Sequence, residues 1–298
     1  MEVGSLEAIA ALAGRHLPDD GRRQTAIPFL SLIRAGRRGA VNRGVLQPSF
    51  CLVIAGCKET HLAQQVIRYG AGDFLVAVID TPSSGQIVRA SRAVPYLAAS
   101  IALDVAEIAA VALEMAMAPP PAARIKTLPG AFVGRADAEL REAVHRLLRL
   151  LDAPRDAAFL APAIRREIAY RLLSGEHGAL LYRNAVAGQG EQGVGRAIAW
   201  LRTHLDRPLR VEELAQASNM SVSSLHHKFK AVTNMGPLQY QKQLRLQAAR
   251  QLLLTGDIDA GHAAARVGYE SQSQFSREYR RLFGAPPMQD VRSLRAAE

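Results

Sequence analysis

Two short stretches in the last third of the sequence place polar and basic side chains between apolar residues that recur every three or four positions. In the first stretch, the outward side chains are Ser223, His226, His227 and Lys230. In the second, they are Ser273, Gln274, Arg277, Arg280 and Arg281. Glutamine and arginine can pair with base edges in the major groove of DNA, whereas lysine and arginine neutralise phosphates. These residue types therefore suit contact with nucleic acid.

Residues 211–232 carry the first stretch and predict a short amphipathic helix, a turn around Ser218 and Asn219, and a second helix. Ser221 suits the N-cap of the second helix, because a serine oxygen accepts a hydrogen bond from a free N–H group of the first turn. Three apolar residues at helical spacing bury the inner face: Leu225, Phe229 and Val232. The pattern predicts a helix-turn-helix unit.

A similar layout recurs about fifty residues later, with a helix up to Val267, a turn at Gly268 and a second helix capped by Ser271. Its inward residues are Phe275, Tyr279 and Leu282. Between the two units, one long helical pattern of about eighteen residues, which includes Tyr240, Leu246 and Leu253, predicts a rod of about 27 Å. Successive major-groove segments on one face of DNA lie about 34 Å apart, so one chain could read two of them.

Composition sets wider limits on the chain. Its 298 residues suit two domains, and 49% hydrophobic with 21% charged residues is typical of a soluble globular protein. Neither a signal peptide nor an apolar run long enough to span a membrane is evident, so we expect a cytoplasmic protein with no membrane contact. The net charge of +10 is shared almost evenly between residues before and after 188, so charge does not locate the DNA surface.

The N-terminal part predicts a different architecture. Between residues 25 and 103, short alternating apolar segments are separated by glycine and proline, which indicates strands. The predicted strands are 29–34, 50–55, 58–63, 65–69, 74–79, 87–90 and 96–103. Helical spacing follows at 105–115, 140–151 and 164–173, with Pro119–Pro121 ending the first helix and Pro154 and Pro162 separating the other two.

These patterns predict an α+β chain with two domains. The first, residues 1–187, is expected to be a cupin-like jelly-roll β-barrel with flanking helices. The second, residues 188–298, is expected to be an all-α tandem helix-turn-helix domain that starts at the glycine-rich stretch Gly188–Gly193.

Three stretches resemble one known family. Met220–His226, Pro237–Leu246 and Val267–Gly284 match, in this order, the tandem signature of AraC-type (AraC/XylS) transcriptional regulators. Upstream, Thr25–Pro28, Gln47–Lys58 and Tyr69–Val76 are similar to the subgroup with a cupin-like N-terminal domain. Two positions depart from the wider family, because Asp290 stands where tyrosine is common and Gly236 stands where serine is usual.

The resemblance implies a sequence-specific DNA-binding regulator. Its base-contacting positions fall on Ser223, His226, His227, Gln272, Ser273, Gln274 and Arg277. Phosphate contacts are expected from Ser221, Lys228, Lys230, Arg280 and Arg281. The implied partners are double-stranded promoter DNA, RNA polymerase and a second copy of the chain. A small-molecule or redox signal would act on the N-terminal domain, which could instead serve only dimerisation.

Cys51 and Cys57 are the only cysteines and suit neither a disulfide framework nor a multi-cysteine metal site. A thiolate near Lys58 could sense oxidants or electrophiles, although Cys51 lies in an apolar run that favours simple packing.

The alternative function is a metal-dependent cupin enzyme fused to a DNA-binding module. Only His16 and His61 precede residue 145, which argues against a histidine-rich metal centre. His226 and His227 are adjacent, so their side chains point in directions about 100° apart along a helix and do not converge on one ion. We therefore expect no metal, no cofactor and no catalytic residue.

Overall fold

The computed structural model describes residues 4–39, 41–62, 65–117, 130–189, 193–233, 235–256 and 258–295. Contacts divide the chain into two compact units, Met1–Val41 with Leu46–Gln189, and Asn42–Val45 with Gly190–Glu298. None of the helices in the described part of the chain has the combination of length and hydropathy that a membrane crossing requires.

The strands form two sheets, and all of them except most of β3 belong to the N-terminal unit. The larger sheet has the order β1-β2-β9-β4-β7-β10, and the smaller has the order β3-β8-β5-β6. Their strands are β1 (Gly21–Gln24), β2 (Leu30–Ala35), β3 (Asn42–Leu46), β4 (Ser49–Ala55), β5 (Cys57–Leu62), β6 (Gln65–Gly70), β7 (Asp73–Ala77), β8 (Thr81–Arg89), β9 (Tyr96–Ala102) and β10 (Ala131–Arg135). All seven strands predicted from alternation are present, and β1, β3 and β10 are further strands that the alternation did not predict. Strand β10 pairs with β7.

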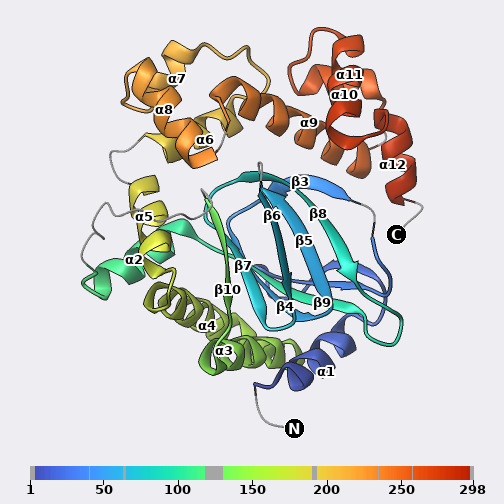
Figure 1. The fold of residues 1–298 in the computed structure, drawn as a ribbon, viewed down its shortest axis with the longest axis vertical. Helices are drawn as coiled ribbons and strands as arrows, with labels where there is room; N and C mark the ends of the chain where they lie inside the picture. Colours follow the sequence, from blue (N-terminus) through green and yellow to red (C-terminus); the bar gives the residue numbers. More distant parts are fainter. Residues whose placement is uncertain are drawn as a thin grey trace. The chain divides into compact units, whose positions relative to one another are not determined.

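Five α-helices accompany the sheets: α1 (Leu6–His16), α2 (Val105–Glu114), α3 (Ala138–Arg149), α4 (Pro154–Ser174) and α5 (Gly178–Gln189). A 3-10 turn, η1 (Leu150–Asp152), precedes α4. Figure 1 shows α2, α3, α4 and α5 gathered beside the sheets. The C-terminal compact unit is helical. Its helices are α6 (Val194–Thr203), α7 (Val211–Ala217), α8 (Val222–Thr233), α9 (Pro237–Thr255), α10 (Ala260–Arg266), α11 (Gln272–Phe283) and α12 (Pro287–Arg295).

The six-stranded sheet is buried on both faces, as strand β4 shows. Phe50 and Leu52 belong to a core formed with α1–α5, whereas Val53 belongs to a second core with Tyr69 of the smaller sheet. Successive side chains of a strand point to opposite faces, so one strand can serve both cores. The N-terminal unit is thus layered as sheet, sheet and helices, and the α+β class is confirmed. Its cupin-like character stays a prediction.

Two local predictions meet a different outcome, and a third concerns residues outside the described part of the chain. Pro162 lies inside α4 instead of ending a helix, because α4 already begins at Pro154 and its buried residues Ile164 and Ile168 hold the rest of the helix against the core. Gly188 and Gln189 continue α5, so the glycine-rich stretch does not begin at residue 188 as a loop. The triplet Pro119–Pro121 lies outside the described residues.

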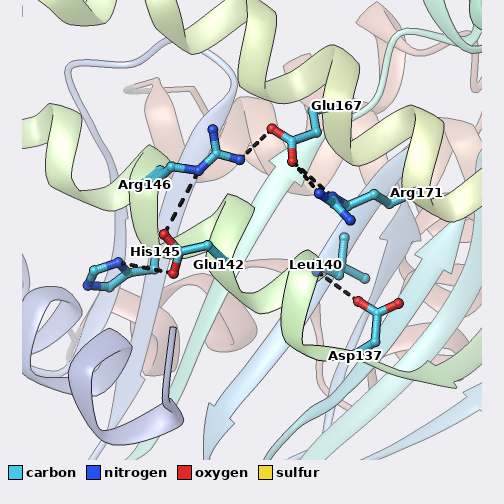
Figure 2. A network of polar contacts seen from close by, with 7 residues as sticks. All are labelled: Asp137, Leu140, Glu142, His145, Arg146, Glu167 and Arg171. Carbon is cyan, nitrogen blue, oxygen red and sulfur yellow. Dashed lines mark hydrogen bonds and ion pairs between the residues drawn. The ribbon is translucent and has the colours of Figure 1, made fainter. Parts of the chain in front are cut away.

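An ion-pair network joins α3 to α4 (Figure 2). The Glu167 carboxylate on α4 accepts hydrogen bonds from Arg146 on α3 and from Arg171, whose Nε lies 2.9 Å from Glu167 Oε1. Glu142 lies within ion-pair distance of Arg146, and Asp137 caps α3 through the N–H of Leu140. Burial acts to raise the pKa of Glu167, but the hydrogen bonds from Arg146 and Arg171 outweigh it and hold this pKa below its ordinary value.

Replacing Glu167 by glutamine is expected to lower the free energy of unfolding by about 1–2 kcal/mol at neutral pH, because two charge-assisted hydrogen bonds are weakened. A carboxylate with a lowered folded-state pKa stabilises fully above its ordinary pKa of 4.5, and this contribution is lost as the pH falls through the folded-state value. The difference between wild type and variant should therefore shrink in acid.

Urea unfolding followed by circular dichroism, at neutral pH and in acid, measures both effects. The matched control is Glu139→Gln on the exposed first turn of α3, which should change stability by less than about 0.5 kcal/mol. A deficit of the Glu167 variant that stays the same at both pH values would contradict the electrostatic explanation.

Candidate nucleic-acid interface

The first helix-turn-helix unit consists of α7 and α8. Leu214 of α7 and Leu225 and Phe229 of α8 are fully buried, which fixes the two helices against each other. The turn between them passes through Asn219, whose φ of 52° is left-handed, a conformation that asparagine tolerates better than most residues. The Ser221 hydroxyl accepts a hydrogen bond from the N–H of Ser224 at 3.2 Å, so the predicted N-cap is confirmed.

The outer face of α8 is polar and open. The predicted contact residues there are all exposed: Ser221, Ser223, His226, His227, Lys228 and Lys230. No hydrogen bond or ion pair joins the side chain of Lys228 or Lys230 to another described residue. Both ammonium groups are therefore available to an external phosphate.

The second helix-turn-helix unit consists of α10 and α11 and is built in the same way as the first. Phe275 and Tyr279 of α11 are fully buried, and the Ser271 hydroxyl accepts a hydrogen bond from the N–H of Gln274 at 3.3 Å. The turn passes through Gly268, with φ of 82°. A Cβ atom at Gly268 would lie 2.3 Å from the carbonyl oxygen of Asp206, so only glycine fits here.

The outer face of α11 carries the second set of predicted contacts. All six are exposed: Gln272, Ser273, Gln274, Arg277, Arg280 and Arg281. Gln274 is partly engaged, since its Nε2 donates to Glu278 Oε1 at 3.2 Å. The guanidinium groups of Arg277, Arg280 and Arg281 have no side-chain partner among the described residues. Helix α11 thus presents three unpaired cations to solvent.

Helix α9 holds the two helix-turn-helix units through one half-buried arginine. The Arg245 guanidinium donates to the carbonyl oxygens of Leu205 at 2.5 Å, Arg207 at 2.6 Å and Gly268 at 2.9 Å. Leu205 and Arg207 lie in the loop that leads into the first unit, and Gly268 is the turn of the second. Burial lowers the pKa of Arg245, but arginine is protonated at any physiological pH. The Arg245 side chain therefore connects both helix-turn-helix units to α9.

Further contacts bind α9 to the second unit. Arg250 forms a two-pronged ion pair with Asp290, with Nε–Oδ2 at 2.7 Å and Nη2–Oδ1 at 2.9 Å, and the Tyr279 hydroxyl donates to the same carboxylate at 2.9 Å. This gives Asp290, which departs from the wider family, a structural role. Sequence reasoning missed these supports because an arginine in a helix does not reveal whether it faces solvent or a carbonyl.

The two candidate sensing cysteines lie at the smaller core of the N-terminal unit. Burial raises the pKa of the Cys51 thiol, although the charges of Lys58 and Arg22 act to lower it. Cys57 is 7% exposed, and its sulfur accepts a hydrogen bond from Arg68 Nε at 3.5 Å. Both thiols are free. These surroundings favour the packing interpretation of Cys51, and a sensing role for either cysteine stays a prediction.

The space between the two sheets holds polar groups that lack partners. Lys58 of β5 lies opposite Tyr69 of β6 in the strand register. No hydrogen bond or ion pair joins the Lys58 ammonium group to another described residue. Burial lowers the pKa of Lys58. The Tyr96 hydroxyl is buried without a hydrogen-bond partner, whereas the Tyr69 hydroxyl lies 3.0 Å from Thr60 Oγ1. A Cβ atom at Gly85 would lie 2.8 Å from Lys58 Cε, so this glycine makes room for the lysine.

Within the described ranges, no group of three or more histidine, cysteine, aspartate or glutamate side chains is arranged to hold a metal ion. This observation concerns only those ranges.

Comparison with known proteins agrees with this geometry. Residues 26–180 match the model of the AraC-type transcriptional regulator N-terminus, and residues 214–293 match a helix-turn-helix domain. The HTH-type transcriptional activator RhaS of Salmonella schwarzengrund is 28% identical over 166 residues, which cover 55% of this chain and 58% of RhaS. RhaS of Salmonella agona matches to the same extent. The chain thus spans only somewhat more than half the length of these relatives.

The fold has known counterparts as well. ToxT from Vibrio cholerae aligns over 88% of this chain and 97% of its own, with a TM-score of 0.61 and 10% identity. At this identity the likeness concerns the fold. The matched families and relatives are transcription regulators, so they give no support to the alternative of a metal-dependent enzyme. Because the N-terminal model alone covers more than half of the 298 residues, the chain belongs to the AraC-type transcriptional regulators.

Proposed function

We propose that this chain binds double-stranded promoter DNA through the outer faces of α8 and α11, and that a signal received by the N-terminal unit modulates this binding. The observation that carries the proposal is the pair of capped helices with unpaired cations, both fixed to α9 through Arg245. Helix α9 has 19 residues and is therefore about 28 Å long. This length is comparable with the groove repeat of about 34 Å.

The contacts divide into two kinds. Base recognition is assigned to Ser223, His226, His227, Gln272, Ser273, Gln274 and Arg277. Phosphate binding is assigned to Ser221, Lys228, Lys230, Arg280 and Arg281. Arginine and glutamine can bind base edges with two hydrogen bonds, whereas phosphate contacts position the protein without reading sequence.

The remaining partners follow from this role. A regulator of transcription acts where the chromosome and RNA polymerase are, so we place the protein in the cytoplasm with RNA polymerase as a partner. The N-terminal unit, assigned to residues 1–187, would carry sensing and homodimerisation, and residues 188–298 would carry DNA binding. Two copies would present four recognition helices to one operator, which raises the apparent affinity for paired sites.

Replacing Arg277 by alanine is expected to cost about 1–3 kcal/mol of binding free energy on the preferred site and to relax specificity at one base pair. The reason is that Arg277 is exposed, unpaired and placed to bind a guanine edge. Fluorescence anisotropy with a set of duplexes that vary one base pair at a time measures both changes.

The matched control is Lys230→Ala, which should weaken binding to all of these duplexes alike and flatten the logarithmic salt dependence by about 0.9. Uniform weakening by Arg277→Ala would instead move Arg277 to phosphate binding. Unchanged affinity in both variants would contradict the proposed DNA surface.

The sensing role is supported by the groups without partners between the sheets. The Tyr96 hydroxyl is buried without a hydrogen-bond partner, which costs stability, and the Lys58 ammonium group of the same unit has no hydrogen bond to a described residue. A polar ligand between the sheets would give both groups a partner. We therefore assign effector binding to the surroundings of Lys58 and Tyr96. Redox sensing by Cys51 or Cys57 is the second candidate, and the raised pKa of Cys51 makes it the weaker one.

Replacing Lys58 by methionine is expected to raise the urea midpoint of the N-terminal unit, because an unpaired cation is removed from a partly apolar space. The matched control is Arg89→Met on the neighbouring strand. Arg89 Nη2 donates to the carbonyl of Gly56 at 3.4 Å, so its loss should bring no gain. A lower midpoint for Lys58→Met would show that the lysine serves folding and would contradict a ligand-binding role.

A further inference from the structure

A cavity of the N-terminal unit lies on the helix side of the six-stranded sheet, away from the polar groups between the two sheets. Its volume of about 470 Å³ falls within the range of small-molecule sites. It is bounded by the segment that leads into β2, including Pro28 and Phe29, and by the first turns of α4, including Ala158 and Pro162. It shares no residue with the surroundings of Lys58 and Tyr96.

The walls of this cavity are small and stiff. On the α4 side they are alanines and prolines, among them Pro154, Ala157, Ala158 and Ala161. Such residues have little or no side-chain freedom to lose when a ligand binds. Ala158 is exposed, so a larger residue there could close the space without disturbing the buried core. The cavity is thus preformed, and a packing requirement alone does not account for it.

Arg165 is the only charged residue that lines the cavity in the described part of the chain. Its Nε lies 2.7 Å from Glu107 Oε2, and its guanidinium carbon lies 4.7 Å from the centre of the Phe29 ring. These two contacts hold the guanidinium group beside a carboxylate and an aromatic ring. Neither terminal nitrogen has a hydrogen-bond partner among the described residues. The cavity therefore has an apolar body and one oriented set of free donors.

The pairing with Glu107 decides the charge of the ligand. An anionic ligand would have to share the guanidinium with a carboxylate already in place, and the two like charges would repel each other. A cation would meet the guanidinium itself. An uncharged oxygen acceptor binds the free N–H groups without either cost. We infer that this cavity binds a small, uncharged, largely apolar molecule that carries a hydrogen-bond-accepting oxygen, such as an aryl ketone, ester or amide.

Two probes of the same size and ring system test this inference on the full chain. Isothermal titration calorimetry should show saturable binding of 2-acetonaphthone, which is neutral, and binding of 2-naphthoate at least about tenfold weaker. Glu107→Gln removes the competing carboxylate and should reduce or reverse this preference. A wild-type protein that prefers the naphthoate, or a preference that Glu107→Gln leaves unchanged, would overturn the inference.

Two further variants locate the binding. Ala158→Phe should weaken 2-acetonaphthone binding roughly tenfold or more by filling the cavity, and Arg165→Met should weaken it roughly tenfold by removing the donors. The matched control is Ala163→Phe, on the same helix but lining a different pocket, which should leave the affinity within about twofold. Equal losses in Ala158→Phe and Ala163→Phe, or no saturable binding to wild type, would overturn the inference.

Circular dichroism of each variant verifies that the fold is intact before titration. DNA affinity, measured separately by anisotropy, reports on the helix-turn-helix units and not on this cavity. Ligand binding in this cavity is measured independently of DNA binding, so its test does not depend on the proposed function.

Discussion

The DNA-binding half depends on the guanidinium of Arg245. Backbone carbonyls in loops accept hydrogen bonds, and here three carbonyls from two separate loops accept them from one side chain. Arginine suits this task because its donors are fixed in a plane, so each bond restrains the direction of the others. Gln241, one turn earlier on α9, supports the same loop through the carbonyl of Arg207 at 3.0 Å. The orientation of both recognition helices thus follows from a few polar contacts on α9.

The N-terminal half solves a different problem. Its six-stranded sheet has an apolar core on the helix side, formed by residues such as Phe50 and Leu52, and a smaller core on the side of the second sheet. The helix-side core leaves an apolar cavity next to Arg165, whereas the inter-sheet core admits Lys58 and an unpartnered tyrosine hydroxyl. A core built only for stability would fill the first space and exclude the second pair. These two departures are the observations on which the two proposed ligand sites rest.

Much of this organisation could be predicted from the sequence. The two helix-turn-helix units, their serine caps and the exposure of all twelve predicted contact residues follow from periodicity and capping, because these elements are amphipathic and local. Seven of the eight strands between residues 25 and 103 follow from alternation in the same way, and β3 is the exception. Strand β1 escaped because all four of its residues are exposed, and β10 escaped because it is five residues long and pairs with β7 from far along the chain. The helix end predicted at Pro162 is absent, because tertiary packing holds α4 together despite the proline.

The absent side chain of Gly268 has a consequence for the DNA itself. A Cβ atom added at Gly268 would lie 2.3 Å from the carbonyl oxygen of Asp206, so the turn of the second helix-turn-helix unit packs closely against the loop before the first. In the proposed complex, a rigid reader of this kind accepts one separation between its two half-sites. One inserted base pair turns the second half-site by about 35° around the duplex axis. The spacing of bases in the operator is thus set in part at a residue that belongs to neither recognition helix.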